Sequence, residues 1–171
     1  MRRIGFFCVL ILVTLASCKS KKAVTKNTKQ PAKKEYSELS KKLNLEVDKS
    51  DNIKLYKFVG NWLGVPHKMG SCSQNAIDCS CFVKLLHQQV YNNNLPRTAD
   101  EMHKKSSSIN QKNLTEGDLV FFKINSKKVS HVGVYLKQGW FAHVSTSKGV
   151  MINNLSEAYY DKHFTGAGKI K

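Results

Sequence analysis

Apolar residues follow a helical spacing in the first half of the chain and form short runs in the second half. Three stretches between residues 36 and 91 repeat apolar side chains at helical spacing, and a short polar helix is expected after the turn at 95–98. The three predicted helices cover 36–47, 53–63 and 79–91. After residue 116, β-branched and aromatic residues gather in short runs, which is the pattern of strands. The predicted strands cover 119–122, 132–136, 140–144 and 150–152.

The order of these elements predicts the fold class. Helices that come first and strands that follow as a meander favour an α+β fold with an antiparallel sheet. The chain has 171 residues, a size typical of one compact domain with a tail, and 41% of them are hydrophobic, enough for a core. We therefore expect N-terminal helices packed on a central antiparallel β-sheet, with a polar loop at 67–77 before the third helix.

The amino terminus predicts export from the cytoplasm. Arg2 and Arg3 precede an apolar run of about a dozen residues, which is too short to span a bilayer and is typical of a signal peptide. The run ends in Leu-Ala-Ser-Cys (15–18), which resembles the lipobox of bacterial lipoproteins. We expect a signal peptide at 1–17 and a lipid anchor on Cys18, with ordinary secretion as the alternative.

A lysine follows the predicted anchor, and the next stretch is polar. In the sorting rules of Gram-negative lipoproteins, Asp at that position resembles a signal for retention in the inner membrane, and Lys19 does not. Attachment to the outer membrane, facing the periplasm, is therefore favoured. Residues 18–35 are rich in lysine and cannot bury a core, so we predict a flexible tether there and a folded domain at 36–171.

The formal net charge of +16 invites a nucleic-acid interpretation, but the distribution of the charge argues against one. Nine of the 28 cations lie within the first 34 residues, where no acid occurs, so more than half of the excess falls outside the predicted domain. No zinc-finger, RNP or basic-zipper pattern accompanies the charge. We expect no nucleic-acid partner, and the lysines of the tether are suited to anionic lipid headgroups or to solvent.

Three of the five cysteines, Cys72, Cys79 and Cys81, fall within the predicted domain. An odd number in an oxidising compartment indicates a reactive thiol or an intermolecular bridge. Asp78-Cys79-Ser80 lies where the polar loop enters the third helix. A thiol there meets the positive end of the helix dipole, which favours the nucleophilic thiolate, and the neighbouring N–H groups can stabilise an oxyanion. Cys79 is therefore the candidate nucleophile.

Two histidines extend this cysteine into a possible catalytic set. His131 opens one predicted strand, and His143 lies twelve residues later on the next. If the two strands form a hairpin around residues 137–139, both imidazoles lie at one end or face of the sheet. One imidazole can then accept the Cys79 proton, and the other can orient the first by a hydrogen bond.

Five segments together resemble the NlpC/P60 cysteine peptidases of bacterial cell walls. They are Asp-Cys-Ser (78–80), Leu-Pro-Arg-Thr (95–98), Glu-Gly-Asp-Leu-Val-Phe-Phe (116–122), His-Val-Gly-Val-Tyr-Leu (131–136) and Phe-Ala-His-Val-Ser (141–145). They occur in the order and at the spacing of that family. The resemblance covers about residues 50–170. It implies a papain-like fold for the domain at 36–171.

The same resemblance implies a role for each residue of the site. Cys79 is the expected nucleophile, His131 the base, and His143 the polar third member that orients the base. Asp78 and Ser80 are expected to shape the substrate cleft, in several members of the family by meeting the free amine of a stem peptide.

The chain departs from the family pattern near the nucleophile. Many members have Pro-Tyr there, with the phenol in the active site, whereas here Pro66 is followed by His67, which we place among the substrate-binding residues. The usual Gly-Gly is Gly-Ser at 70–71. A small residue normally follows Cys-Ser, and Cys81 stands in its place; it can pair with Cys72 in a disulfide or compete as a second thiol.

Three alternatives remain open beside the peptidase. A zinc site would use His67, Cys72, Cys79 and Cys81, although their spacing matches no common zinc motif. A non-catalytic wall-binding module on the same fold is the second, and another acyl transfer, such as transamidation or lipid deacylation, is the third. We expect a monomer without metal or cofactor that hydrolyses amide bonds in the stem or cross-link peptides of peptidoglycan through a thioester.

Overall fold

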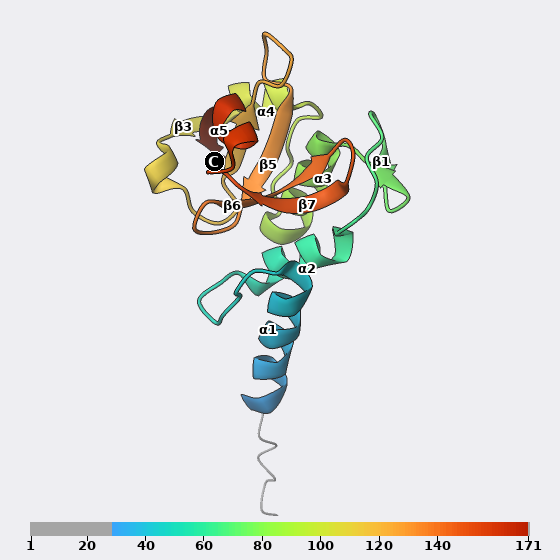
Figure 1. The fold of residues 1–171 in the computed structure, drawn as a ribbon, viewed down its shortest axis with the longest axis vertical. Helices are drawn as coiled ribbons and strands as arrows, with labels where there is room; N and C mark the ends of the chain where they lie inside the picture. Colours follow the sequence, from blue (N-terminus) through green and yellow to red (C-terminus); the bar gives the residue numbers. More distant parts are fainter. Residues whose placement is uncertain (1–28, 171) are drawn as a thin grey trace, which may run out of the picture.

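The computed structural model describes residues 29–170 and arranges them as helices beside an antiparallel sheet (Figure 1). Within these residues the α-helices are α1 Lys29–Leu43, α2 Ile53–Trp62, α3 Cys79–Tyr91, α4 Ala99–Lys105 and α5 Ala158–His163. The strands are β1 Cys72–Ser73, β2 Ala76–Ile77, β3 Ser107–Ile109, β4 Leu119–Phe122, β5 His131–Tyr135, β6 Trp140–Ser145, β7 Gly149–Asn154 and β8 Phe164–Lys169. One short 3₁₀ helix, η1, covers Gln111–Asn113. The predicted α+β fold class is confirmed.

The main sheet contains the predicted meander and two further strands. Its order is β3-β8-β4-β5-β6-β7, and each neighbouring pair is antiparallel. Strands β4 to β7 follow one another as the sequence predicts, whereas β8 returns to pair with the free edge of β4. Strands β1 and β2 form a separate hairpin in the polar loop before α3. This hairpin lies next to the first residues of α3.

The helices begin and end where local chemistry favours it. Asp78 is the N-cap of α3, and Asn92 ends that helix in the left-handed conformation, with φ of 56°. Thr98 and Glu101 form a complete capping box at the start of α4. Asn52 occupies the N-cap position of α2 without a side-chain capping bond. The start of α3 is therefore defined by a side chain that the resemblance also places in the site.

The boundary of the predicted tether needs correction. Residues 29–35 are the first turns of α1 and not part of a flexible segment. Lys, Gln and Ala are good helix formers, and Pro31 lies in the first turn, where proline is tolerated. Glu35 pairs with Lys57 of α2 at 2.5 Å. The pattern gave no signal because these turns carry no apolar stripe. The signal peptide and the anchor on Cys18 lie outside the described residues.

Two elements near the C-terminus, β8 and α5, and the edge strand β3 escaped the sequence pattern. Strand β8 contains two glycines, which weaken any strand signal. Helix α5 has six residues and β3 has three, too few for a period to emerge. Each forms because a neighbour supplies a surface: β4 offers its edge to β8, and β8 in turn pairs with β3.

Both faces of the sheet are buried, which explains why the strands are continuous apolar runs. The four residues of β4 are all fully buried. The main core packs α1, α2 and α3 against one face; it includes Leu55, Tyr56, Phe82, Leu86, Phe121, Val132 and Val134. A smaller cluster covers the other face and consists of Val120, Phe122, Phe141, Leu155 and Tyr160.

The hairpin of β5 and β6 brings the two candidate histidines to one place. It turns around residues 137–139, as predicted, and pairs the strands antiparallel. Gly133 of β5 faces His143 of β6: a β carbon at Gly133 would lie 2.7 Å from Phe141 Cδ2 and 3.3 Å from His143 Cβ. The missing side chain therefore allows the two strands to approach where His131 and His143 must meet.

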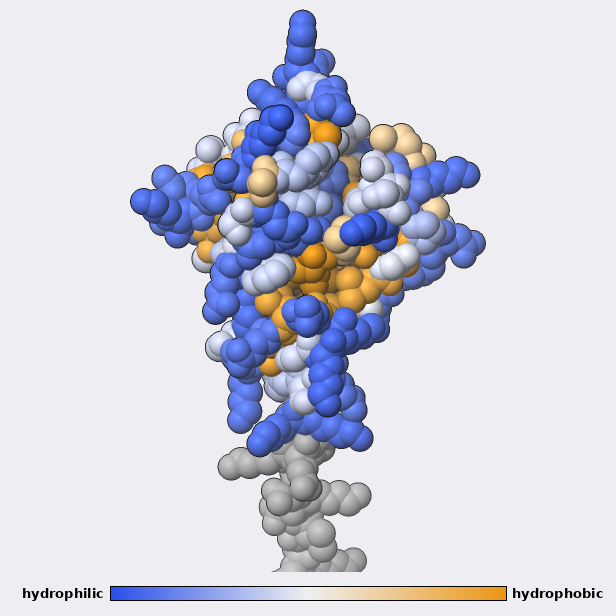
Figure 2. Space-filling model, viewed as in Figure 1, coloured by the Kyte–Doolittle hydropathy of each residue, from blue (hydrophilic) through white to orange (hydrophobic). Residues whose placement is uncertain are grey.

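The surface is mainly hydrophilic on the face shown in Figure 2, with apolar side chains gathered near its centre. Among the described residues, the large hydrophobic side chains that are exposed are Met69 and Tyr159, at 80% and 53%. Met69 lies on the loop before α3. No helix within residues 29–170 has the length and apolarity needed to cross a membrane.

Candidate active site

Cys79 is the first residue of α3 and lines a cleft of about 460 Å³. Its side chain is half-buried and, unlike the other two cysteines of the described domain, it is free. The loop before α3 contributes Met69 to the cleft, and the segment leading into α4 contributes Arg97. Val129 lines it from the segment before β5. Four separate segments thus meet around the thiol.

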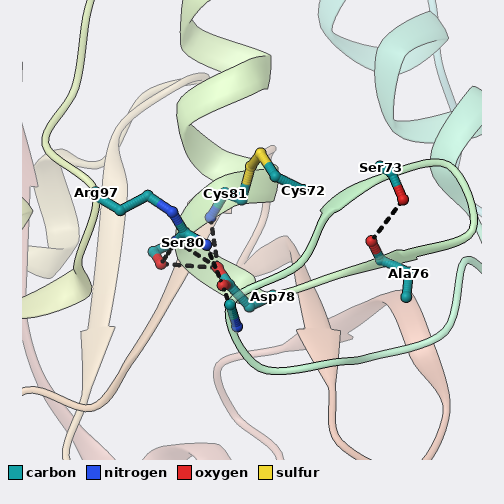
Figure 3. Close-up of a disulfide and its surroundings, with 8 residues drawn as sticks. Cys72, Ser73, Ala76, Asp78, Ser80, Cys81 and Arg97 are labelled. Atoms are coloured by element: carbon teal, nitrogen blue, oxygen red, sulfur yellow. Dashed lines mark hydrogen bonds and ion pairs between the residues drawn. A yellow bond between two sulfur atoms is a disulfide. The ribbon is translucent and has the colours of Figure 1, made fainter.

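The Asp78 carboxylate ties these segments together (Figure 3). Its Oδ1 accepts bonds from the Cys81 backbone N–H at 2.8 Å, from the Ser80 hydroxyl at 2.9 Å and from Arg97 Nη1 at 2.9 Å. Its Oδ2 accepts from the Gly70 N–H at 3.0 Å and from Arg97 Nη2 at 2.5 Å. Asp78 is only 3% exposed. Its lone pairs are therefore engaged inside the protein, and it shapes the cleft rather than presenting a free oxygen to it.

Arg97 decides the charge state of that carboxylate. Burial on its own would raise the pKa of Asp78, but hydrogen bonds from Arg97, the Cys81 N–H and Ser80 outweigh it and hold the pKa below its usual value. Arg97 Nη1 also donates to Ser80 Oγ at 2.8 Å. The sequence placed Arg97 in a motif but assigned it no role, since nothing in the pattern showed that its guanidinium reaches back nineteen residues.

A disulfide joins the loop to the helix that begins at Cys79. Cys72 of β1 and Cys81 of α3 are bonded, with Cα atoms 5.6 Å apart (Figure 3). Of the two possibilities left open for Cys81, the structure therefore has the bridge. The bond also occupies two of the four sulfur and nitrogen ligands that the zinc alternative requires, and no group of three metal-binding side chains converges within residues 29–170.

The two histidines are directly hydrogen-bonded. His131 Nε2 lies 3.0 Å from His143 Nδ1, and the two rings are nearly perpendicular, at 86°. His143 is 1% exposed, and its Nε2 lies 2.9 Å from Asn153 Oδ1 and 3.1 Å from the Tyr160 hydroxyl. The bond to His143 uses Nε2 of His131 and leaves Nδ1 as the other ring nitrogen of that imidazole.

Cys79 lies against the same strand as His131. The backbone N–H of Val132, the residue after His131, interacts with the Cys79 sulfur and favours the thiolate. Burial nevertheless raises the pKa of the Cys79 thiol to about 11, and the Asp78 charge adds to this. The prediction that the helix terminus alone favours a thiolate therefore omitted the larger effect, which is desolvation.

Burial acts on the histidines in the opposite direction. It lowers the pKa of His131 to about 3, and the charges of His143 and His67 contribute. It lowers the pKa of His143 to about 4, against the stabilising effects of Asn153 and Glu157. Burial therefore favours the neutral form of the thiol and of both imidazoles.

The predicted site residues come from two parts of the fold, which meet at the Val132 N–H and the Cys79 sulfur. Asp78, Cys79 and Ser80 lie at the start of α3, and His131 and His143 lie on β5 and β6. His67 pairs through its backbone with Ile77 and lies close enough for its charge to affect His131.

The residues that sequence reasoning missed support the site from outside its motifs. Asn153 and Tyr160 contact His143, but Asn153 follows the predicted strand at 150–152, and Tyr160 belongs to a helix that was not predicted. An aromatic and an asparagine in polar surroundings carry no signal of their own. Asn153 and Tyr160 reach His143 only in the folded protein, where β7 pairs with β6 and α5 follows β7.

A cysteine at a helix start, packed against the strand that carries one of two hydrogen-bonded imidazoles, is an arrangement that cysteine hydrolases use. The NlpC/P60 family model matches residues 64–169. A probable endopeptidase NlpC homolog of Haemophilus influenzae is 38% identical over 109 residues, covering 64% of this chain and 57% of that protein. Murein DD-endopeptidase MepS/murein LD-carboxypeptidase of Escherichia coli is 30% identical over 174 residues, covering 97% of this chain and 91% of that protein. The chain belongs to the NlpC/P60 family.

The fold comparison agrees. A crystal structure of an NlpC/P60 family protein from Bacillus cereus superposes with a TM-score of 0.63 at 24% identity and covers 68% of this chain and 39% of that one. At this identity the likeness concerns the fold, and it confirms the helices and antiparallel sheet described above.

Removal of the disulfide should lower the stability of the fold and leave peptide cleavage largely intact. The bridge closes a loop over a sequence separation of 9, and replacing it by Cys72→Ser with Cys81→Ala should lower the free energy of unfolding by about 2–3 kcal/mol on a loop-entropy estimate. Urea unfolding measures this, with the wild type in reductant as a comparison. Because neither sulfur faces the cleft, peptide cleavage should largely persist at temperatures where the variant is folded. A folded variant without activity would contradict this role.

The acid limit of activity should lie well below the pKa of an ordinary histidine. An imidazole can act as a base only while neutral, and the lowered pKa of His131 keeps that ring neutral as the pH falls through 6.5. We expect kcat/KM for cleavage of a soluble muropeptide to stay nearly constant from neutrality down to about pH 5, where an unperturbed imidazole is almost fully protonated. The exposed His103→Ala variant serves as control. An acid limb centred near 6.5 would contradict the expectation.

Proposed function

We propose that the protein is a cysteine peptidase that hydrolyses amide bonds in the stem or cross-link peptides of peptidoglycan. The observation that carries the proposal is the hydrogen-bonded His131–His143 pair, whose strand β5 meets the Cys79 sulfur at the Val132 N–H. The chain also aligns over nearly its full length with a murein DD-endopeptidase. Cys79, His131 and His143 are the nucleophile, the base and the residue that orients the base. The H. influenzae and E. coli relatives are themselves described as endopeptidases.

The reaction begins with both catalytic groups neutral. As the Cys79 sulfur attacks the peptide carbonyl, its proton passes to Nδ1 of His131. Backbone N–H groups at the start of α3 stabilise the oxyanion, as the positive end of a helix does in general. His131 then protonates the leaving amine, which departs and leaves a thioester on Cys79. Water, deprotonated by His131, releases the acyl product and restores the thiol.

The cleft favours an acidic peptide. Arg97 uses three N–H groups on Asp78 and Ser80 and remains about two-fifths exposed at the cleft wall. A guanidinium has five N–H donors, so two remain for a ligand. Peptidoglycan stems carry carboxylates, which suit a guanidinium, and Met69 supplies an apolar wall opposite. His67, beside His131, is proposed to position the peptide from the other side.

We further propose that Cys18 is lipidated and holds the enzyme in the cell envelope, at the outer membrane facing the periplasm. The motif Leu-Ala-Ser-Cys at 15–18 and Lys19 support this location. An anchor makes physical sense for such an enzyme, because it raises the local concentration of the enzyme beside a polymer that cannot diffuse to it.

Loss of the thiol should abolish cleavage. Cys79→Ala and His131→Ala should each leave no release of soluble peptides from purified peptidoglycan, because the first removes the nucleophile and the second the base. The exposed His103→Ala variant should cleave like the wild type. Mass spectrometry of the released muropeptides also identifies the bond that is cut. Retained cleavage by Cys79→Ala would exclude the thioester mechanism, whereas wild-type binding to peptidoglycan without cleavage would indicate a non-catalytic wall-binding module.

Lipidation should depend on one side chain. In cells fed a labelled fatty acid, the wild-type chain should incorporate label and fractionate with membranes. The Cys18→Ser variant should do neither, while Cys8→Ser, inside the predicted signal peptide, should behave like the wild type. Label that persists in Cys18→Ser would contradict the anchor and would leave the proposed peptidase activity untouched.

A further inference from the structure

The hydrogen bonds behind the histidine pair continue to a carboxylate. Asn153 of β7 presents Oδ1 to His143 Nε2 at 2.9 Å. The Nδ2 group of the same amide donates to both carboxylate oxygens of Glu157, at 3.0 and 2.7 Å. Glu157 is the N-cap residue of α5, and its Oε1 also accepts the Asn154 backbone N–H at 2.7 Å. A chain of four side chains therefore runs from His131 through His143 and Asn153 to Glu157.

Glu157 fixes which way the Asn153 amide faces. An ionised carboxylate can only accept hydrogen bonds, so it must face the NH₂ end of the amide. If the amide were turned over, its oxygen would meet the carboxylate and two acceptors would face each other. The bond from Asn154 holds the carboxylate in place. The amide oxygen of Asn153 therefore has to point at His143.

That oxygen in turn fixes the proton on His143. An amide oxygen cannot donate, so His143 Nε2 must carry a hydrogen, and in a neutral imidazole Nδ1 is then bare. The Tyr160 hydroxyl agrees with this state, because it donates to Asn153 Oδ1 at 3.3 Å and leaves its oxygen to accept from His143 Nε2 at 3.1 Å. Burial keeps both imidazoles neutral by lowering their pKa values to about 3 and 4.

The bare Nδ1 of His143 then determines the tautomer of His131. The two atoms that meet at 3.0 Å are His131 Nε2 and His143 Nδ1. With Nδ1 of His143 as the acceptor, His131 Nε2 must be the donor, so Nδ1 of His131 is bare. This is the nitrogen that has to accept the proton of Cys79. In the opposite tautomer Nδ1 would carry a hydrogen, and the base would be disabled.

We propose that Asn153 and Glu157 are positioning residues that set the proton of His131 on Nε2 and so keep Nδ1 free to act as the base. The proposal deepens the proposed function and rests on Cys79 and His131 as nucleophile and base. Tyr160 supports the same tautomer from α5. Neither Asn153 nor Glu157 touches the reacting atoms; both act through His143.

The chain of side chains from His131 to Glu157 is called the relay below. The charged and titratable groups around it come from several elements and include the Tyr160 hydroxyl of α5. His131 faces His67 from the loop before α3 and His143 from β6. Cys79 faces Asp78. Glu157 is the carboxylate whose charge acts on His143. A change in the relay is therefore separable from a change at Asp78, which acts on the thiol from the opposite side.

A swap of donor and acceptor tests the relay. Glu157→Gln gives position 157 an amide that can face either end of Asn153, so the tautomer is no longer imposed. Asn153→Leu removes the acceptor. Each should lower kcat/KM for muropeptide cleavage about tenfold to a hundredfold, the range known for the loss of outer-shell partners of metal-bound histidines. The double variant Asn153→Asp with Glu157→Gln again presents only an oxygen to His143 and should recover most of the loss.

The matched control is Asp161→Asn, which removes an equal charge from the same short helix at an exposed position without any contact to Asn153. It should cleave like the wild type. Thermal unfolding of each variant shows whether it is folded, and Glu157→Gln is isosteric with the native residue. Equal kcat/KM in the wild type, Glu157→Gln and Asn153→Leu would overturn the proposal, and so would a double variant no better than Glu157→Gln.

A direct reading of the tautomers separates this proposal from the proposed function. In protein labelled with ¹⁵N at histidine, the imidazole shifts distinguish a protonated ring nitrogen from a bare one without any substrate. We expect Nε2 protonated and Nδ1 bare on both His131 and His143, and a mixture of tautomers in Glu157→Gln. If these shifts are found in a protein that does not cleave peptidoglycan, the relay stands and the proposed substrate fails. A protonated Nδ1 on His131 in the wild type would overturn the relay.

Discussion

The site depends on one buried carboxylate, that of Asp78, whose charge is stabilised by its hydrogen-bond and ion-pair partners. Asp78 caps the helix that presents Cys79, and the same two oxygens hold Arg97, Ser80 and the loop at Gly70. A buried charge without these partners would be costly, so the helix start, the loop and the segment before α4 are stable only together. The shape of the cleft therefore follows from the contacts that stabilise the charge of Asp78. The disulfide from the loop to Cys81 reinforces the same junction.

Burial then sets the chemistry of the groups that the cleft exposes to a peptide. It raises the pKa of the thiol and lowers the pKa of both imidazoles, so that the resting state is uncharged. A neutral pair can act only if the base holds its lone pair toward the thiol. Protonation at the correct ring nitrogen matters more here than in a site that rests as an ion pair. The hydrogen bonds from His143 to Asn153 and from Asn153 to Glu157 are directional, and in the proposed relay they set the ring nitrogen of His131 that carries the proton.

The sequence predicted more of the fold than of the support for the site. The helices and the strand meander followed from apolar spacing, whereas the caps at Asp78, Asn92 and Thr98 were found in the structure. Strands β3 and β8 and helix α5 were missed, since their residues take a conformation that the edge of β4 and its neighbours impose. The start of α1 was placed too late for a related reason: its first turns lack an apolar stripe.

The sequence by itself determined the family, the candidate nucleophile and the two histidines. These residues lie in local motifs that can be recognised from their spacing along the chain. Only the tertiary structure decided which sulfur atoms pair, that Arg97 neutralises Asp78, and that Asn153 and Glu157 lie behind His143. These contacts join residues from different elements, and a hydrogen bond has no pattern along the chain until folding brings its two ends together. Desolvation, which governs the protonation of the site, is likewise a property of the packed interior and not of any residue taken alone.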